Sequence, residues 1–187
     1  IKEGRIGRLR LMRGEFTFSL QEPGNIRMDP TMGGGCLWDI GCYPVSYARA
    51  LAGMEPEEVF GYQVTGPSGV DTSFSGALRF PGDLLAQFQC SFTAPYSVGF
   101  EVAGEQGRIT ISHPFTPGRR EKFNLARGER KETIPVRADE LYQYEVEDLA
   151  DAALEGKPPR LSLADSRNNI AVLLALFESA RLGKPVN

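Results

Sequence analysis

The sequence predicts an α+β domain in which one helix is followed by a run of mainly antiparallel strands and then by two further helices. Short alternating segments between residues 57 and 136 indicate the strands. Tight turns such as Pro81-Gly82-Asp83 and Arg127-Gly128-Glu129 separate several of these segments, and strands joined this closely pair antiparallel. A chain of 187 residues can bury a sizeable core, so we expect a single domain over residues 1–187.

The first segment, residues 5–20, predicts a half-buried strand because its apolar residues follow a period of two from Phe16 onward. Residues 21–35 are polar and rich in glycine and proline, which indicates a long loop. Long loops inside compact domains are usually functional or disordered.

A helix is predicted over residues 39–51, ending at Gly53. Its apolar positions share one face: Val45, Ala48, Leu51 and Ala52. Pro44 fits the first turn of a helix but would kink it further in, so the sequence leaves the helix start open.

Seven strands are expected next, over residues 59–65, 73–80, 84–92, 98–103, 108–112, 122–126 and 132–136. Alternation is clearest in the third, whose apolar side consists of Leu84, Ala86, Phe88, Cys90 and Phe92. One face of the sheet is therefore expected to be apolar and to cover helices or a partner subunit.

Two helices are predicted after the strands. The first covers residues 139–155, with an apolar side made of Leu141, Tyr142, Val146, Leu149 and Ala153, and ends at Gly156 and Pro158-Pro159. The second begins at Ser162, where Asp165 completes a candidate capping box, and runs to Gly183 and Pro185. Its apolar stripe includes Ile170, Leu173, Leu174 and Phe177.

Composition excludes several classes of protein. The net charge of −3 is spread along the chain without a basic block, so we expect no nucleic-acid partner. No apolar run approaches the length of a membrane span, and we expect no membrane partner. Three cysteines are too few and odd in number for a disulfide framework, which favours a reducing compartment and a cytoplasmic location.

Motifs for cofactors and metals are missing. No G-x-G-x-x-G follows a strand and no Walker A loop is present, and the triple glycine Gly33-Gly34-Gly35 is interpreted as a tight backbone turn rather than a phosphate site. His113 lacks a second ligand at useful spacing, so no metal site is expected. The cysteines are interpreted as small buried residues, and Cys42 is the one considered for reactivity.

The most informative chemistry lies just after the glycines. Asp39 and Tyr43 are four residues apart and would share a face of a helix. A tyrosine can donate or relay a proton but is a poor base near neutral pH unless a cation lowers its pKa, and a carboxylate can orient a substrate hydroxyl. A structural tyrosine and an aspartate at a helix start explain the same residues, so the pair alone leaves both readings open.

Residues 33–43 resemble the G-G-G-x-L-x-D-x-G-x-[HY] segment of the glucose–fructose oxidoreductase, inositol dehydrogenase and MocA family. The resemblance runs in order through nearly the whole chain, including Gly69-Val70-Asp71, Cys90-Ser91-Phe92 and Val102-Ala103-Gly104-Glu105-Gln106-Gly107. It continues through residues 51–59, 168–173 and 179–183. Tyrosine at position 43, rather than histidine, resembles the branch with dihydrodiol dehydrogenase and D-xylose dehydrogenase.

This resemblance implies the C-terminal domain of an oxidoreductase that uses NAD or NADP. It implies a large open sheet with helices on one face, like the C-terminal domain of glyceraldehyde-3-phosphate dehydrogenase. It also implies a homo-oligomer formed through the open sheet face, and a sugar, cyclitol or dihydrodiol as substrate. The family's N-terminal Rossmann domain binds the cofactor and supplies a catalytic lysine in an E-K-P motif, and neither is present in this chain.

The resemblance assigns roles to individual residues. Tyr43 would donate or accept the proton beside the absent lysine, and Asp39 would orient the substrate. Asn25 and Arg27, in the loop before the glycines, and Trp38 are candidates for substrate binding. Solvated or structural roles for Arg27, and core packing for Trp38, are the alternatives.

Three hypotheses about function follow. In the first, the chain is a fragment of a longer dehydrogenase and is inactive alone, because it cannot hold the nicotinamide cofactor. In the second, the fold is kept as a non-catalytic structural or interaction module. A third, a hydrolase using Asp39, has little support because no second acid stands at a recognisable spacing.

Overall fold

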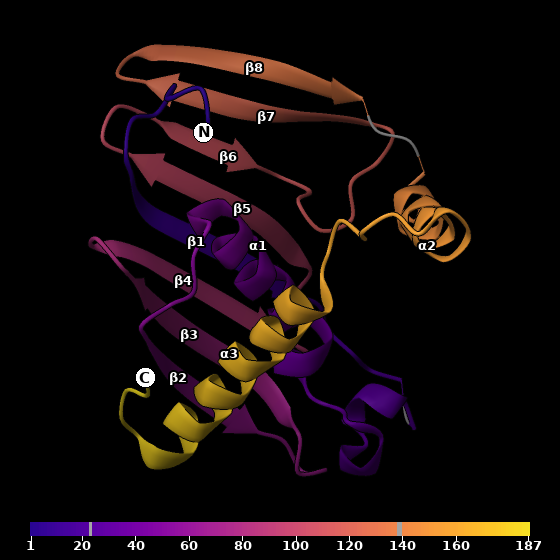
Figure 1. Cartoon of the computed structure of the whole chain (residues 1–187). Helices are drawn as coiled ribbons and strands as arrows, with labels where there is room; N and C mark the ends of the chain where they lie inside the picture. Colours follow the sequence, from indigo (N-terminus) through magenta and orange to yellow (C-terminus); the bar gives the residue numbers. More distant parts are fainter. Residues whose placement is uncertain (23, 138–139) are drawn as a thin grey trace.

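Eight strands form one open sheet in the computed structural model, which describes residues 1–22, 24–137 and 140–187 (Figure 1). The strands are β1 (Leu9–Thr17), β2 (Glu58–Thr65), β3 (Asp71–Phe80), β4 (Leu84–Ser91), β5 (Ser97–Gly104), β6 (Arg108–Ile111), β7 (Arg120–Arg127) and β8 (Arg130–Arg137). Their order across the sheet is β2-β3-β4-β1-β5-β6-β7-β8. The α+β class and the mainly antiparallel open sheet are thus confirmed.

The first strand lies in the middle of the sheet. β1 pairs in parallel with β4, where Leu11 lies opposite Leu85, and antiparallel with β5, where Met12 lies opposite Val102. The other neighbouring strands pair antiparallel, and tight turns join β3 to β4, β5 to β6 and β7 to β8. The sheet is therefore mixed at one pair, which the local turn signals did not predict.

Two helices cover one face of this sheet. α1 (Cys42–Ala52) packs on β1 and β4, and α3 (Leu163–Leu182) packs on β2 and on α1 (Figure 1). The predicted apolar side of β4 faces these helices, since Leu84, Ala86, Phe88 and Cys90 are all buried in the core. Pro44 is the third residue of α1, which directly continues a π-helix at Leu37–Gly41, so its missing N–H falls where the chain passes from the π-helix to the α-helix.

Several boundaries differ from the sequence prediction. The helix expected over residues 39–51 is a π-helix at Leu37–Gly41 that continues into α1. The helix expected over residues 139–155 is α2 (Gln143–Glu155), so its start was placed too early, and Asp139 lies outside the described residues. The apolar side of α2 is exposed, with Tyr142, Val146 and Leu149 each more than 60% accessible.

The buried stripe of α3 is also rotated from the predicted one. Leu173 is buried as predicted, but Ile170 and Leu174 are exposed, and Val172 and Leu176 face the core instead. The cap at Ser162 is confirmed, because its Oγ accepts the Asp165 N–H at 3.0 Å. Among the described residues, no helix combines the length and the apolar character that crossing a membrane requires.

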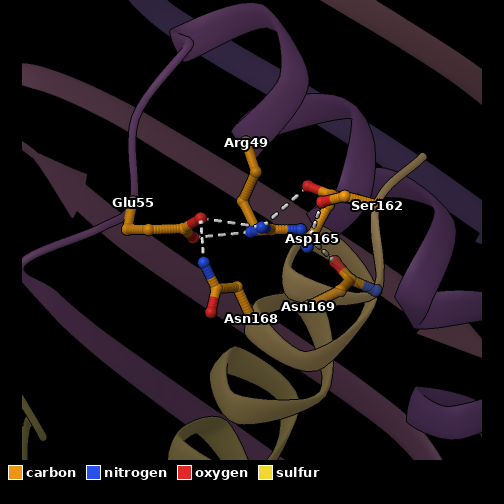
Figure 2. Close-up of polar contacts among 6 residues, drawn as sticks. All are labelled: Arg49, Glu55, Ser162, Asp165, Asn168 and Asn169. Atoms are coloured by element: carbon orange, nitrogen blue, oxygen red, sulfur yellow. Dashed lines mark hydrogen bonds and ion pairs between the residues drawn. The ribbon is translucent and has the colours of Figure 1, made fainter. Parts of the chain in front are cut away.

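A buried arginine joins the end of α1 to the start of α3 (Figure 2). Arg49 is 4% exposed and donates from Nε and Nη2 to the two carboxylate oxygens of Glu55, at 2.6 and 2.7 Å. It also donates to Asp165 Oδ1 at 3.0 Å and to Asn169 Oδ1 at 3.2 Å. Asn168 closes the network by donating to Glu55 at 3.0 Å. The helix that carries Tyr43 is thereby fixed to α3.

Candidate active site

The candidate site begins at a glycine turn that is tied to the sheet by one buried acid. Asp71, at the start of β3, accepts the Leu37 N–H at 2.6 Å and the Cys36 thiol at 3.1 Å through Oδ2. Burial raises the pKa of Asp71, and these two donors partly oppose that effect. Asp71 therefore fixes the start of the π-helix that carries Asp39.

Gly34 and Gly35 are required because other atoms fill the space that a Cβ would need at each of them. The Gly34 and Gly35 N–H groups donate to the carbonyls of Asp29 and Arg27, both at 2.9 Å. A Cβ at Gly35 would lie 2.0 Å from Asp71 Oδ1, and the φ of Gly35 is +122°. The interpretation of the triple glycine as a tight backbone turn agrees with this arrangement. Since its amides are bonded and its space is occupied, the turn does not fit the phosphates of a dinucleotide.

We expect Gly35→Ala to destabilise the domain strongly, by about 3 kcal/mol, because the new methyl group must displace Asp71 and also adopt a positive φ. Gly33→Ala is the matched control. Gly33 also has a positive φ but open space around its Cβ position, so we expect a loss of about 1 kcal/mol. Urea unfolding of the three chains measures both effects, and equal losses at the two positions contradict this account of the turn.

Tyr43 stands at the first turn of α1 and remains 40% exposed. Its ring packs against Phe16 of β1 and against Phe115, with both pairs of ring centroids 5.7 Å apart. These two rings hold the phenol at the edge of the core while it stays accessible to solvent. The π-helix immediately before it is a local irregularity of the kind often found at functional sites.

The surroundings keep Tyr43 protonated. Burial is the largest cause that raises its pKa, and the negative charge of Asp39 and the acidic groups of Cys42, Tyr142 and Glu145 raise the pKa further. Tyr43 is therefore a neutral phenol that can donate a hydrogen bond or a proton at neutral pH. Serving as a base would require a cation that lowers its pKa.

We expect Tyr43 to ionise only above pH ~10 in this chain, because the folded state holds its proton more tightly than the unfolded chain does. The stability linked to this proton is present below pH ~10 and is lost as pH rises through the folded-state pKa. The difference in absorbance at 295 nm between the native chain and Tyr43→Phe, followed against pH, isolates this ionisation. A midpoint below pH ~9 contradicts the prediction.

Asp39 is paired with Arg27. The Nε of Arg27 donates to Asp39 Oδ2 at 2.7 Å, and both side chains are partly exposed. Among the hydrogen bonds of the described residues, none uses Asp39 Oδ1 or the terminal nitrogens of Arg27. The pair therefore has no net charge and offers one acceptor and several donors to a bound molecule.

The other two candidate substrate residues make local contacts. The Asn25 Oδ1 accepts the Arg27 N–H at 3.0 Å and so caps the short 3-10 turn Ile26–Met28, which positions Arg27. The half-buried ring of Trp38 packs against Phe177 of α3, with centroids 5.6 Å apart. A substrate contact for either residue stays a prediction.

Sequence reasoning gave no site role to three residues that influence this region. Asp71 was noted only because Gly69-Val70-Asp71 resembles the family sequence. An acid at the start of a strand with buried apolar residues was the available signal for its structural role. Tyr142 and Glu145 lie near enough to Tyr43 to raise its pKa, so the start of α2 borders the site. Their proximity depends on how α2 is positioned after β8, for which the sequence carries no signal.

The remaining candidates behave as structural residues. Cys36 and Cys90 are buried, and burial raises the pKa of the partly buried Cys42 to about 11, so its thiol is a weak nucleophile. His113 is exposed, with Nδ1 3.2 Å from Glu121. No group of three potential metal ligands occurs in the part of the chain that the structure describes.

Comparison with known proteins decides the family. The family model for the GFO/IDH/MocA C-terminal domain matches residues 1–110. The chain belongs to this family. The sequence-based resemblance is therefore confirmed.

Longer relatives support the same assignment. An NADP(+)-dependent D-xylose 1-dehydrogenase of Haloferax volcanii is 31% identical over 97% of this chain and 57% of its own length. An oxidoreductase of Rhizobium meliloti is 31% identical over 98% of the chain and 57% of the relative. The chain thus spans a little over half the length of these relatives.

A solved structure extends the comparison. A 3-ketoreductase from Actinomadura kijaniata, in complex with NADP and TDP-benzene, superposes with a TM-score of 0.90 at 26% identity. The match covers 95% of this chain and 56% of that protein. The large open sheet and its helices are thus shared with this 3-ketoreductase over nearly the whole chain.

Proposed function

We propose that this chain is the substrate-binding and oligomerisation domain of an NAD(P)-dependent oxidoreductase that acts on a sugar, cyclitol or dihydrodiol. The observation that carries the proposal is the neutral phenol of Tyr43 next to the Arg27–Asp39 pair, just after the glycine turn and within the residues that the family model matches. The rest of the enzyme would be a preceding Rossmann domain, consistent with the greater length of the relatives.

The cofactor would be NAD or NADP, and the glycine turn of this domain does not fit its phosphates, because other atoms occupy the space at Gly34 and Gly35. When bound, a nicotinamide supplies the hydride chemistry. The residues of this chain would handle the substrate's oxygen. The Tyr43 hydroxyl would donate a proton to the oxygen of a carbonyl in reduction and accept it back in oxidation, next to a cation from the preceding domain.

The Arg27–Asp39 pair supports an uncharged polyol as the substrate. Asp39 Oδ1 can accept a hydrogen bond from one hydroxyl while a terminal nitrogen of Arg27 donates to the next. Because the two charges compensate each other, the pair does not favour a strongly charged ligand. Vicinal hydroxyl groups match this adjacent donor and acceptor.

The decisive experiment compares this chain with the protein extended by its own upstream coding sequence. Both are assayed with NAD and NADP against a panel of sugars, cyclitols and dihydrodiols. We expect turnover only by the longer protein. Turnover by the 187-residue chain alone contradicts the proposal that a preceding domain must bind the cofactor. If both proteins are inactive across the panel, the result favours a non-catalytic module.

The open face of the sheet is the proposed oligomer interface. Leu11 and Leu85 lie side by side on it, across the β1–β4 pair, and are 52% and 43% exposed. A hollow of about 440 Å³ on the same face is lined by residues that include Tyr62, Gln87 and Gln89. Exposed apolar side chains among polar ones are typical of a protein–protein contact.

We expect Leu85→Glu to weaken self-association by about tenfold or more, because a buried charge opposes closure of the interface. Leu154→Glu, on the exposed side of α2, is the matched control and should leave association unchanged. Light scattering over a concentration series measures both. If the unsubstituted protein, extended by its upstream coding sequence, stays monomeric, this interface is wrong.

A further inference from the structure

One acid is buried close to the candidate site. Asp71 is 3% exposed, and among the described residues it is the only carboxyl group that is buried. No lysine or arginine in the described part of the chain forms an ion pair with it. Burying an ionisable group without a cation is costly, and such groups are concentrated at functional sites. We therefore expect Asp71 to do more than fill the core.

The carboxylate of Asp71 contacts three consecutive residues. Its Oδ2 accepts the Leu37 N–H at 2.6 Å and the Cys36 thiol at 3.1 Å. Its Oδ1 lies against Gly35, where a Cβ would come within 2.0 Å of that oxygen. Asp71 thus holds the backbone at the point where the glycine turn becomes the π-helix.

Gly35 in turn connects the two members of the Arg27–Asp39 pair. Its N–H donates to the Arg27 carbonyl at 2.9 Å, and its carbonyl accepts the Asp39 N–H at 3.1 Å. The side chains of the pair then meet at 2.7 Å, between Arg27 Nε and Asp39 Oδ2. A displacement of Gly35 would therefore move both ends of this ion pair, and the side chain packed against Gly35 is Asp71.

Two buried thiols hold the carboxylate from the side of β4. The sulfur atoms of Cys36 and Cys90 lie 3.6 Å apart, and both residues are buried. The hydrogen bond with Cys90 and burial raise the pKa of the Cys36 thiol, so it keeps its proton and remains a donor to Asp71. Asp71 belongs to β3 and is thereby also tied to β4.

Tyr43 is held by different contacts. Its ring packs on Phe16 and Phe115, and Arg49 fixes α1 to α3 (Figure 2). Asp71 is not among the groups that most raise the pKa of Tyr43. The contacts of Asp71 therefore bear on the ion pair that would bind substrate more than on the proton transfer assigned to the phenol.

We propose that Asp71 is a positioning residue for substrate binding, which holds Arg27 and Asp39 in register through Gly35. The inference rests on the proposed function, because it takes the Arg27–Asp39 pair as the group that binds adjacent hydroxyls of a polyol. A donor and an acceptor recognise such a ligand only if their spacing is fixed, and small displacements of binding groups are costly. Because a ground-state contact is kept in the transition state, its loss raises KM and leaves kcat nearly unchanged.

The kinetic test uses the protein extended by its upstream coding sequence. In Asp71→Ala the Leu37 N–H loses its acceptor, and we expect KM for the polyol to rise about tenfold while kcat changes by less than about threefold. Asp71→Asn keeps an acceptor oxygen of the same reach, so its KM should stay within about threefold of the native value. Asp71→Ser, whose side chain is too short to reach the Leu37 N–H, should behave like Asp71→Ala and replaces it if that variant does not fold.

Ser179→Ala is the matched control. Ser179 is also fully buried, and its Oγ accepts the Gly61 N–H at 3.1 Å between α3 and β2. We expect this variant to lower the midpoint of urea unfolding, as Asp71→Ala does, and yet to leave KM unchanged. A native KM in Asp71→Ala overturns the proposal, and so does an equal rise of KM in Ser179→Ala.

A second measurement does not depend on turnover. The Nε–H of Arg27 is protected from exchange with water by its hydrogen bond to Asp39, and its NMR signal in the 187-residue chain is assigned by its loss in Arg27→Lys. We expect this exchange to be about tenfold faster in Asp71→Ala and native-like in Asp71→Asn and Ser179→Ala. Unchanged exchange in Asp71→Ala overturns the proposal even if the enzyme is active. If the extended protein turns over no polyol, the proposed function fails, whereas faster exchange in Asp71→Ala still supports the placing of the ion pair by Asp71.

Discussion

In the extended, active protein, Tyr43→Phe is expected to lower kcat by about 10²- to 10⁴-fold, because the substituted ring cannot transfer a proton to the substrate oxygen. The phenylalanine keeps the contacts with Phe16 and Phe115, so the fold and the substrate KM should change little. Steady-state kinetics and circular dichroism of the purified variant measure these quantities.

Tyr47→Phe provides the matched control for this experiment. Tyr47 lies one turn further along α1, and its hydroxyl donates to the Pro114 carbonyl. Loss of that hydroxyl should lower the free energy of unfolding by about 1 kcal/mol and leave kcat nearly unchanged. If Tyr43→Phe retains the native kcat, the role assigned to Tyr43 is wrong.

Arg49→Met is expected to lower the free energy of unfolding by about 3 kcal/mol. The guanidinium is buried and paired with Glu55 and Asp165, and no methionine atom can replace those hydrogen bonds. Arg181→Met is the control, because Arg181 pairs with Glu178 on the exposed side of α3 and should change stability by less than about 0.5 kcal/mol. Urea unfolding at pH 7 measures the stability of both variants. Equal losses of stability in Arg49→Met and Arg181→Met would contradict the view that the burial of Arg49 makes its ion pairs important.

The same ion-pair network makes the free energy of unfolding depend on pH. Hydrogen bonding and charge from Arg49 lower the pKa of Glu55 in the folded state. The contribution of ionised Glu55 to stability is therefore complete above its unfolded-state pKa of ~4.5 and is lost as pH falls through its lowered folded-state pKa. The gap in stability between the native chain and Arg49→Met should narrow over this acidic range. A gap that stays constant down to pH 2 argues against Glu55 as the main partner.

Local patterns in the sequence predicted local structure well. The alternation of Leu84, Ala86 and Phe88 identified the buried face of β4, because a strand places alternate side chains on opposite faces whatever its partners are. Gly53 and Ser162 marked helix ends for a similar reason, since caps act within one turn.

Contacts between distant segments were harder to predict. Ile170 and Leu174 are as apolar as their buried neighbours on α3, and their exposure depends on where β2 places that helix. The Arg27–Asp39 pair was not predicted, because a turn between the two residues determines whether they meet. Asp71 acts on Leu37 through the packing of β3 beneath the π-helix, and only the assembled sheet makes that contact visible.

The central place of β1 has a consequence for how the chain folds. β1 is made before the other strands of the sheet, and its partners β4 and β5 come after β2 and β3 in the chain. Pairing over such sequence separations slows folding. Until then both edges of β1 lack their partners, and unpaired strand edges invite association with other chains. We expect a nascent chain stopped before β4 to recruit chaperones, and one stopped after β5 to have escaped them.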